Sequence, residues 1–250
     1  MTTAEKLQKS AEYMERLDAK NKELEKRLNG GKVVGGSYQD KFWDAWQDYG
    51  NRTDYRYSFA GKFGYIYDYI KLNYDIHPQN ASRMFESSNL TEDVVIFFEK
   101  QGVILDFSNT SDFTWAFSNS AITHIGVIDT RSANDIGYII GNANYLITVD
   151  KVILKNDGTQ KTNSHSFSCK NIQNITFEGV IGQNIWFSAC TKLTTASLLS
   201  ILTALSKDST LATGKTITLA TAHKAKIESD AACTAQINAA IAAGWTVAYV

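Results

Sequence analysis

The residues of this chain that could take part in chemistry are few and scattered. Its four histidines, at positions 77, 124, 165 and 223, form no HExxH motif and no His-x-His pair, which zinc sites commonly use. Gly214-Lys215-Thr216 resembles the end of a phosphate-binding loop, but Ser209 holds the place of its first glycine and a strand is expected to follow. There is no GxSxG nucleophile motif. The sequence therefore favours a non-enzymatic protein, with no catalytic residue, metal site or cofactor.

Three aspartates recur at similar intervals near the ends of expected strands: Asp106, Asp129 and Asp150. A row of carboxylates could bind a cation or a sugar. In a stack of repeats, such aspartates more often accept hydrogen bonds from their own turn, and we favour this interpretation. Glycan hydrolysis would require a facing pair of acids in a groove, and these residues do not indicate one.

The composition is that of a globular protein. Of 250 residues, 44% are hydrophobic and 20% are charged, and the net charge of −1 argues against a nucleic-acid-binding protein. No apolar run approaches the ~18 residues of a membrane span, and no signal peptide is evident, so synthesis in the cytoplasm without export is expected. Cys169, Cys190 and Cys233 form no CxxC motif, and we predict that they are buried and structural.

A loose repeat runs through residues 103–193. An aromatic or aliphatic residue is followed by a small residue and then by a short β-like run, and the leading residues Phe117, Ile140, Phe167 and Phe187 lie 23, 27 and 20 positions apart. This spacing is typical of leucine-rich repeats and predicts a solenoid with a parallel sheet. The aliphatic positions expected to point into one core are Ile122, Ile125, Leu146, Val149, Ile172 and Ile175.

The first 30 residues carry a heptad pattern without glycine or proline before residue 30. One interpretation is an amphipathic helix packed on its own domain. We favour a parallel homo-oligomeric coiled coil, a dimer or a trimer, because the apolar stripe is narrow, the flanks are charged and a lone Asn is a known register device. The residues expected to mediate oligomerisation are Leu7, Met14, Leu17, Asn21, Leu24 and Leu28.

Residues 31–37 form a glycine-rich linker, and residues 38–102 follow as an aromatic-rich region with a degenerate first repeat. Between Tyr38 and Tyr74 there are 13 aromatic residues, in patterns that predict a short helix and a β-hairpin. This module is either a cap that covers the end of the solenoid or a binding platform. The candidate surface-binding residues are Trp43, Trp46, Tyr55, Tyr57, Tyr65 and Tyr67.

Further elements are predicted on both sides of the repeats. Thr91 is expected to cap a short helix that Gly102 ends, and residues 103–107 to begin the strand series. Residues 194–250 should form a C-terminal α/β cap: a helix with its N-cap region at Thr194-Thr195, a strand at 216–219, a helix over about 227–242 ended by Gly244, and a closing strand. The expected fold class is thus α+β, a coiled-coil helix followed by a leucine-rich-repeat-like solenoid with capping helices.

The chain resembles BspA-like leucine-rich-repeat proteins that are encoded in tail regions of phages and prophages of Firmicutes. The likeness covers residues 38–250, and its most specific part is the stretch from Phe42 to Thr53. Several repeat positions that carry Cys or Leu in that family hold Asn, Ala or Tyr here. The segments that resemble the family are 42–47, 50–53, 74–78, 105–108, 126–130, 150–154, 178–182 and 244–247.

The resemblance implies a structural or adhesive role on a virion tail and brings no catalytic residue. Together with the heptads and repeats, it leads us to expect a phage tail or baseplate component that contacts the host cell surface. Its expected partners are itself, other tail or baseplate proteins, and a host glycan or protein. The alternatives are a purely structural virion component and a bacterial cell-surface adhesin.

Overall fold

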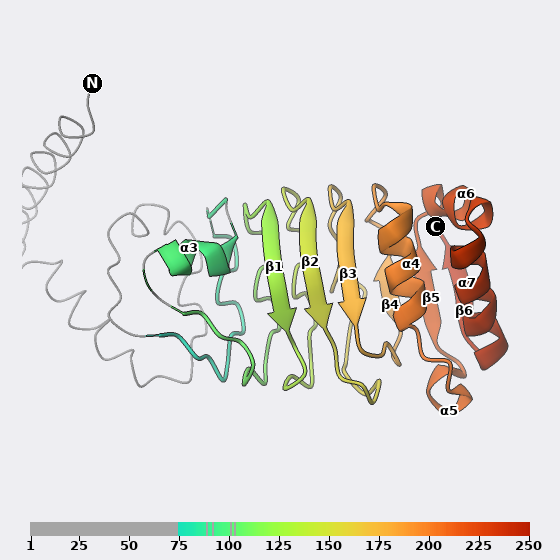
Figure 1. Cartoon of the computed structure of the whole chain (residues 1–250), viewed down its shortest axis with the longest axis horizontal. Coiled ribbons are helices and arrows are strands. Elements are labelled where there is room, and N and C mark those ends of the chain that lie inside the picture. Colours follow the sequence, from blue (N-terminus) through green and yellow to red (C-terminus); the bar gives the residue numbers. More distant parts are fainter. Residues whose placement is uncertain (1–74, 89, 92, 101, 103) are drawn as a thin grey trace, which may run out of the picture. The chain divides into compact units, whose positions relative to one another are not determined.

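A computed structural model describes residues 75–250 except 89, 92, 101 and 103, and this part is a mixed α/β structure with small parallel sheets (Figure 1). The predicted coiled coil 1–30, the linker 31–37 and the aromatic residues 38–74 lie outside the described residues. The same holds for every residue assigned to oligomerisation or to surface binding. No helix in the described part is long and apolar enough to cross a membrane.

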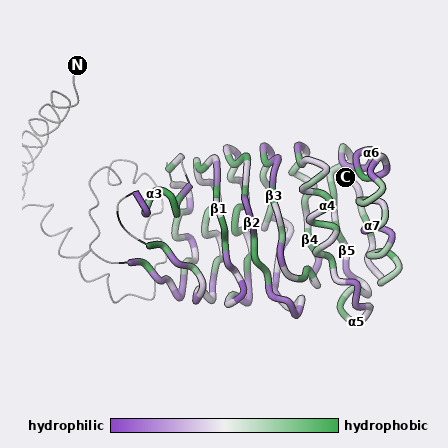
Figure 2. The backbone as a smooth tube through the Cα atoms, viewed as in Figure 1, coloured by the Kyte–Doolittle hydropathy of each residue, from purple (hydrophilic) through white to green (hydrophobic). Residues whose placement is uncertain are grey.

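The first sheet consists of three parallel strands in sequential order, β1 (His124–Asp129), β2 (Thr148–Ile153) and β3 (Asn174–Glu178). Ile125 lies opposite Val149, and Val149 lies opposite Ile175. Each strand therefore begins about one repeat after the strand before it. The segments between the strands run back along another face of the repeats, which we call the second face. In Figure 2 the loops along the lower edge of the view are mostly hydrophilic.

The core contains the aliphatic residues predicted from the repeat. All six are at most 1% exposed: Ile122, Ile125, Leu146, Val149, Ile172 and Ile175. The leading residues are buried as well, and two of them, Phe167 and Phe187, stack on each other, while Phe117 stacks on buried Phe85 from the segment before it. Phe85 lies 5.4 Å from Phe117, and Phe167 lies 5.4 Å from Phe187, measured between ring centroids. The predicted inward positions of the repeat are confirmed.

A helix closes each edge of the first sheet. Beyond β3, α4 (Thr195–Ala204) takes the place of a further strand (Figure 1). The hydroxyl of Ser197 accepts the backbone N–H of Ile175 at 2.9 Å, and that of Ser200 accepts the N–H of Phe177 at 2.8 Å. These side chains satisfy donors that an edge strand would otherwise present to solvent or to another chain.

At the opposite edge, Asp93 links α3 (Val94–Lys100) to β1. One carboxylate oxygen accepts the N–H of Ile96 at 2.9 Å and so caps the helix, while the other accepts the N–H of Gly126 in β1. The predicted helix is therefore confirmed, but the prediction of Thr91 as its cap was wrong. The carbonyl of Thr91 instead accepts hydrogen bonds from Thr123.

Residues 103–107 were predicted to be the first regular strand, and this was wrong. The described part of this segment makes one isolated parallel bridge, from Leu105 to Ile76, and the first strand is β1. Leu105 and Phe107 are still buried, each 5% exposed. The apolar pattern thus marked a core segment, but the backbone around it is not part of the β1–β3 sheet.

The second sheet is also parallel, in the order β4 (Ile185–Phe187), β5 (Thr216–Leu219) and β6 (Thr246–Tyr249). The predicted strand 216–219 and the end of the last helix at Gly244, with φ of 112°, are confirmed. The predicted helix 227–242 is instead two helices, α6 (Ala222–Ser229) and α7 (Ala231–Ala243), because the side chain of Asp230 accepts the N–H of Cys233 and starts a new helix. A one-turn helix, α5 (Ser209–Ala212), was not predicted.

All three cysteines are free and buried, in agreement with a structural role. The thiol of Cys169 donates to the carbonyl of Ile140 at 2.7 Å, and that of Cys190 donates to the carbonyl of Phe167 at 2.6 Å. Burial raises the pKa of the Cys190 thiol to about 12, so it stays protonated and unreactive at neutral pH.

One buried group gives the fold a pH dependence. His223 is fully buried, its Nε2 lies 2.6 Å from the carbonyl oxygen of Cys190, and its Nδ1 has no hydrogen-bond partner. Burial lowers the pKa of His223 below its ordinary value of 6.5, and the nearby charge of Lys226 lowers it further. The unfolded chain therefore binds a proton more readily at this position than the folded chain does.

We expect the His223 contribution to stability to be present above pH 6.5 and lost as the pH falls through the lowered pKa. Urea unfolding between pH 7.5 and pH 5 measures this. The His223→Gln variant, which keeps a donor for the Cys190 carbonyl, should lose less unfolding free energy over this range than the parent. An identical loss in both proteins would show that His223 is not the titrating group.

Candidate functional site

The candidate site is a row of stacked side chains that we call the aromatic row: Arg83, Trp115, Tyr138 and His165. The Arg83 guanidinium carbon lies 4.7 Å from the centre of the Trp115 ring. The Trp115 and Tyr138 rings lie 3.8 Å apart with an interplanar angle of 6°, and the Tyr138 and His165 rings lie 4.8 Å apart at 5°. Trp115 and Tyr138 are half-buried and His165 is exposed, so the row is accessible along one side.

The row lies on the second face, where the chain returns between strands. Asn80, Asp112, Asp135 and Lys161 are joined there by isolated parallel bridges, and a member of the row follows each of them three or four residues later. Backbone hydrogen bonds hold the spacing, from Arg83 N to Thr114 O at 2.9 Å and from Trp115 N to Gly137 O at 3.0 Å.

Short polar side chains fix the turn before each member of the row. Asp112 Oδ1 accepts the N–H of Thr114 at 2.8 Å, and Asp135 Oδ1 accepts the N–H of Gly137 at 2.7 Å. Asn80 and Asn163 make the same bond to Ser82 and His165, both at 2.9 Å. In the first three segments the member of the row directly follows the residue that donates to the Asx side chain, whereas in the fourth His165 is itself that donor.

Three members of the row have a backbone conformation that bulky residues rarely adopt. The φ angles of Arg83, Trp115 and Tyr138 are 58°, 63° and 58°, in the left-handed region. For residues other than glycine this region costs roughly 1–2 kcal/mol each. Ring stacking contributes about 0.5–1.5 kcal/mol per pair, so it offsets much of this cost. The chain retains large side chains where glycine would fit with less strain.

The predicted row of aspartates is only partly present. Asp106 and Asp129 occupy equivalent turns and accept the backbone N–H of Ser108 at 2.8 Å and of Arg131 at 3.1 Å. The Ser108 backbone bond lowers the pKa of Asp106, and the Arg131 side chain lowers that of Asp129. For these two the turn-forming interpretation is confirmed.

For Asp150 the turn-forming interpretation was wrong. The strand register places Ile153 opposite Asp129, whereas Asp150 lies inside β2, with its Oδ1 3.0 Å from His124 Nε2. The three aspartates are spaced similarly in the sequence but do not occupy equivalent positions in the repeats, because the segments between strands differ in length. Among the described residues, no group of three or more His, Cys, Asp or Glu side chains is placed to hold a metal ion.

Sequence reasoning did not find the aromatic row. The signal was present in Asp112-Phe113-Thr114-Trp115 and Asp135-Ile136-Gly137-Tyr138, where an aromatic residue lies three positions after the aspartate of an Asx turn. In the row, neighbouring side chains cover much of the ring faces, so contact with a ligand would involve ring edges and polar tips. Such a surface suits binding, because Trp and Tyr supply rigid contact area with a polar tip.

In comparisons with protein-family models, with curated proteins and with solved structures, nothing matched this chain.

Proposed function

We propose that this protein is a non-enzymatic binding component of a phage tail or baseplate that contacts the host cell surface. Its repeats would form a leucine-rich-repeat-like solenoid with capping helices, displayed on an N-terminal coiled-coil stalk. The aromatic row is the observation that carries the proposal. Three bulky residues are kept in a strained conformation on one face, and this arrangement fixes their side chains at regular intervals.

The described parts favour display and contact over chemistry. Asp106, Asp129 and Asp150 are engaged in turns or ion pairs, and the buried thiol of Cys190 is protonated. Parallel pairing and ring stacking hold the row in place before any ligand arrives. Preorganisation of this kind limits the entropy cost of binding. The resemblance of residues 38–250 to BspA-like tail proteins supports the location on the virion tail.

Glycine substitutions in the row test the proposal. Trp115→Gly and Tyr138→Gly each remove a ring and also relieve the left-handed strain, so the fold should be retained. We expect binding of the full-length protein to cells from a panel of Firmicutes strains to fall at least tenfold for each variant. Retained cells can be counted by flow cytometry with labelled protein, and thermal unfolding checks the fold.

Two matched controls have the same backbone geometry without a ring. Asn119 and Asn142 have φ of 54° and 58°, so Asn119→Gly and Asn142→Gly change the strain without removing an aromatic side chain. Both controls should bind cells as the parent does. If the row variants bind normally but unfold at lower temperature, the row is structural and the proposed binding face is wrong.

A further inference from the structure

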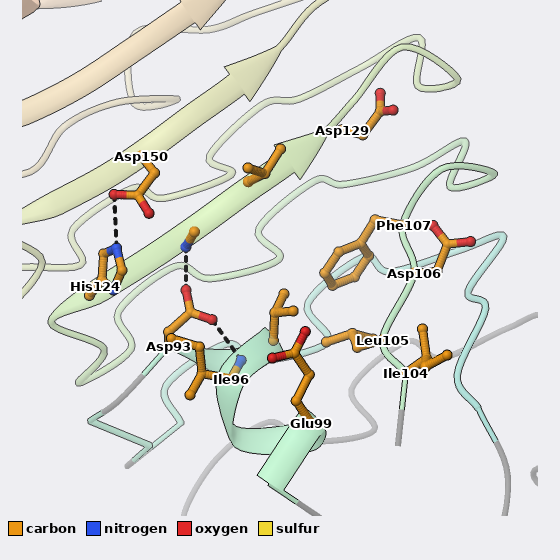
Figure 3. Close-up of a pocket in the computed structure, with 13 residues that line it drawn as sticks. Asp93, Ile96, Glu99, Ile104, Leu105, Asp106, Phe107, His124, Asp129 and Asp150 are labelled. Carbon is orange, nitrogen blue, oxygen red and sulfur yellow. Dashed lines mark hydrogen bonds and ion pairs between the residues drawn. The ribbon is translucent and has the colours of Figure 1, made fainter. Parts of the chain in front are cut away.

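A second surface, away from the aromatic row, is a cleft of about 540 Å³ between α3, residues 104–107 and β1 (Figure 3). We call it the acidic cleft. Three large aliphatic side chains that line it are unusually exposed, Ile96 at 42%, Ile104 at 57% and Val127 at 50%. Leu105 and Phe107 also line it but are almost fully buried, so the apolar area that the described residues leave open to a ligand is aliphatic.

The cleft lies where the regular pairing of neighbouring segments is interrupted. Asp112 is bridged to Asp135, 23 positions later, and the same offset would place Leu105 opposite Ile128. In the described part of the chain, Leu105 is bridged instead to Ile76 on its other side. Asp93, which caps α3, accepts a hydrogen bond from the N–H of Gly126 in β1. The space between the two segments is therefore left open beside the helix.

Among the described residues that line the cleft, the charged side chains are all acidic. They comprise five carboxylates and no Lys or Arg, with His124 as the one other titratable group of this described lining: Asp93, Glu99, Asp106, Asp129 and Asp150. Asp93 is 3% exposed, and both of its carboxylate oxygens already accept hydrogen bonds from backbone N–H groups. The pKa values of Asp106 and Asp129 are lowered, so both are ionised at neutral pH.

Neighbouring basic groups offset only part of this charge. Arg131 pairs with Asp129 at 2.6 Å from outside the cleft, His77 lies 3.3 Å from Asp106, and His124 pairs with Asp150. Glu99 is exposed, and its side-chain carboxylate makes no hydrogen bond or ion pair with another described residue. The cleft therefore has a negative field beside an exposed aliphatic surface.

This combination selects one kind of ligand. Negative charge disfavours nucleic acids, anionic glycans and anionic lipid surfaces. Neutral sugars pack best on aromatic faces, and Phe107, the one aromatic ring that the described residues contribute to the lining, is 5% exposed. Lys and Arg side chains combine an aliphatic stem with a cationic tip, and an aliphatic neighbour in the same peptide would cover the remaining apolar area. Electrostatic complementarity of this type also speeds association.

We propose that the acidic cleft binds a segment of another protein in which Lys or Arg alternates with aliphatic residues. The cationic tips lie against the carboxylates of Glu99 and Asp150, and the aliphatic parts lie on Ile96, Ile104 and Val127. This contact is separate from the aromatic row and does not depend on the proposed contact with host cells. It gives the protein a docking surface for a protein partner.

The test uses the full-length protein and an array of fluorescent nonapeptides in which Lys or Arg alternates with Val, Leu or Ile. A second array replaces every basic residue with Glu. Fluorescence anisotropy should show binding of members of the basic array, with affinity that falls as NaCl is raised, and no binding of the acidic array. Equal binding of both arrays, or none by the basic array at millimolar protein, overturns the proposal.

Variants locate the binding to the cleft. Ile96→Lys and Glu99→Lys should each weaken binding of the best basic peptide at least tenfold. Ile147→Lys is the matched control, because Ile147 has the same 42% exposure as Ile96 but does not line the cleft, and its affinity should stay within twofold of the parent. A similar loss in all three variants would mean that the peptide binds through general charge. Cell binding through the aromatic row should be unchanged in these variants, which separates the two proposals.

Discussion

Replacing Ile125 or Ile175 with Ala should lower the free energy of unfolding by about 2–5 kcal/mol, the usual range for a buried Ile reduced to Ala. Each side chain is 1% exposed, and the two are joined through Val149 across the β1–β2–β3 register. The loss has two parts, because the removed methyl groups no longer leave water on folding and the cavity left behind is only partly filled. Urea denaturation with a two-state fit measures it.

Val127→Ala is the control on the same strand as Ile125. Val127 is 50% exposed, so its truncation should cost about 1 kcal/mol or less. The slope of unfolding free energy against urea should be unchanged in all three variants, because a changed slope would indicate a different unfolded or native state. Losses below ~1 kcal/mol at both isoleucines would contradict the inward orientation of the repeat.

The second large effect concerns copy number. If residues 1–30 form the predicted coiled coil, two or three binding domains share one stalk. Engaging a surface with several copies can raise the apparent affinity by about 10²–10⁴-fold when the geometry permits. We therefore expect cell binding by full-length protein to exceed that of a chain lacking residues 1–30 by at least 10²-fold, at equal concentration of chains.

Sedimentation of both proteins connects this difference to assembly. The full-length chain should sediment as a dimer or trimer at micromolar concentration, and the shortened chain as a monomer. A full-length monomer would refute the coiled coil. Oligomers that bind cells no better than the monomer would refute the adhesive role and favour a structural component of the particle.

The sequence predicted the interior of the described part better than its surface. Burial follows from local pattern, so the inward positions of the repeats, the strand at 216–219 and the end of a helix at Gly244 were all found. The errors in helix boundaries arose where a polar side chain could either cap a helix or lie within or before it. Asp230 looked like one more residue of a long helix but starts a new one, and Asp93 rather than Thr91 caps α3.

The aromatic row depended on information that a linear pattern does not carry. Trp115 and Tyr138 meet because the segments between strands place equivalent turns side by side, and these segments have unequal lengths. The unequal segment lengths also explain why the prediction for Asp150 was wrong. Asp150 is 21 residues from Asp129 but does not lie opposite it in the sheet. Side-chain stacking thus becomes visible only when the register of the strands is known.

The hydroxyls of Ser197 and Ser200 and the carboxylate of Asp93 set the length of the first sheet. Whole repeats could be inserted or deleted between these two boundaries, since each repeat contacts mainly its neighbours. In a longer or shorter protein, α3 would still contact the first strand of the sheet and α4 the last one, with the same backbone geometry at each contact. Related proteins could therefore vary the reach and area of this domain by recombination within 124–178, while Ser197 and Ser200 keep the β3 edge from pairing with another chain.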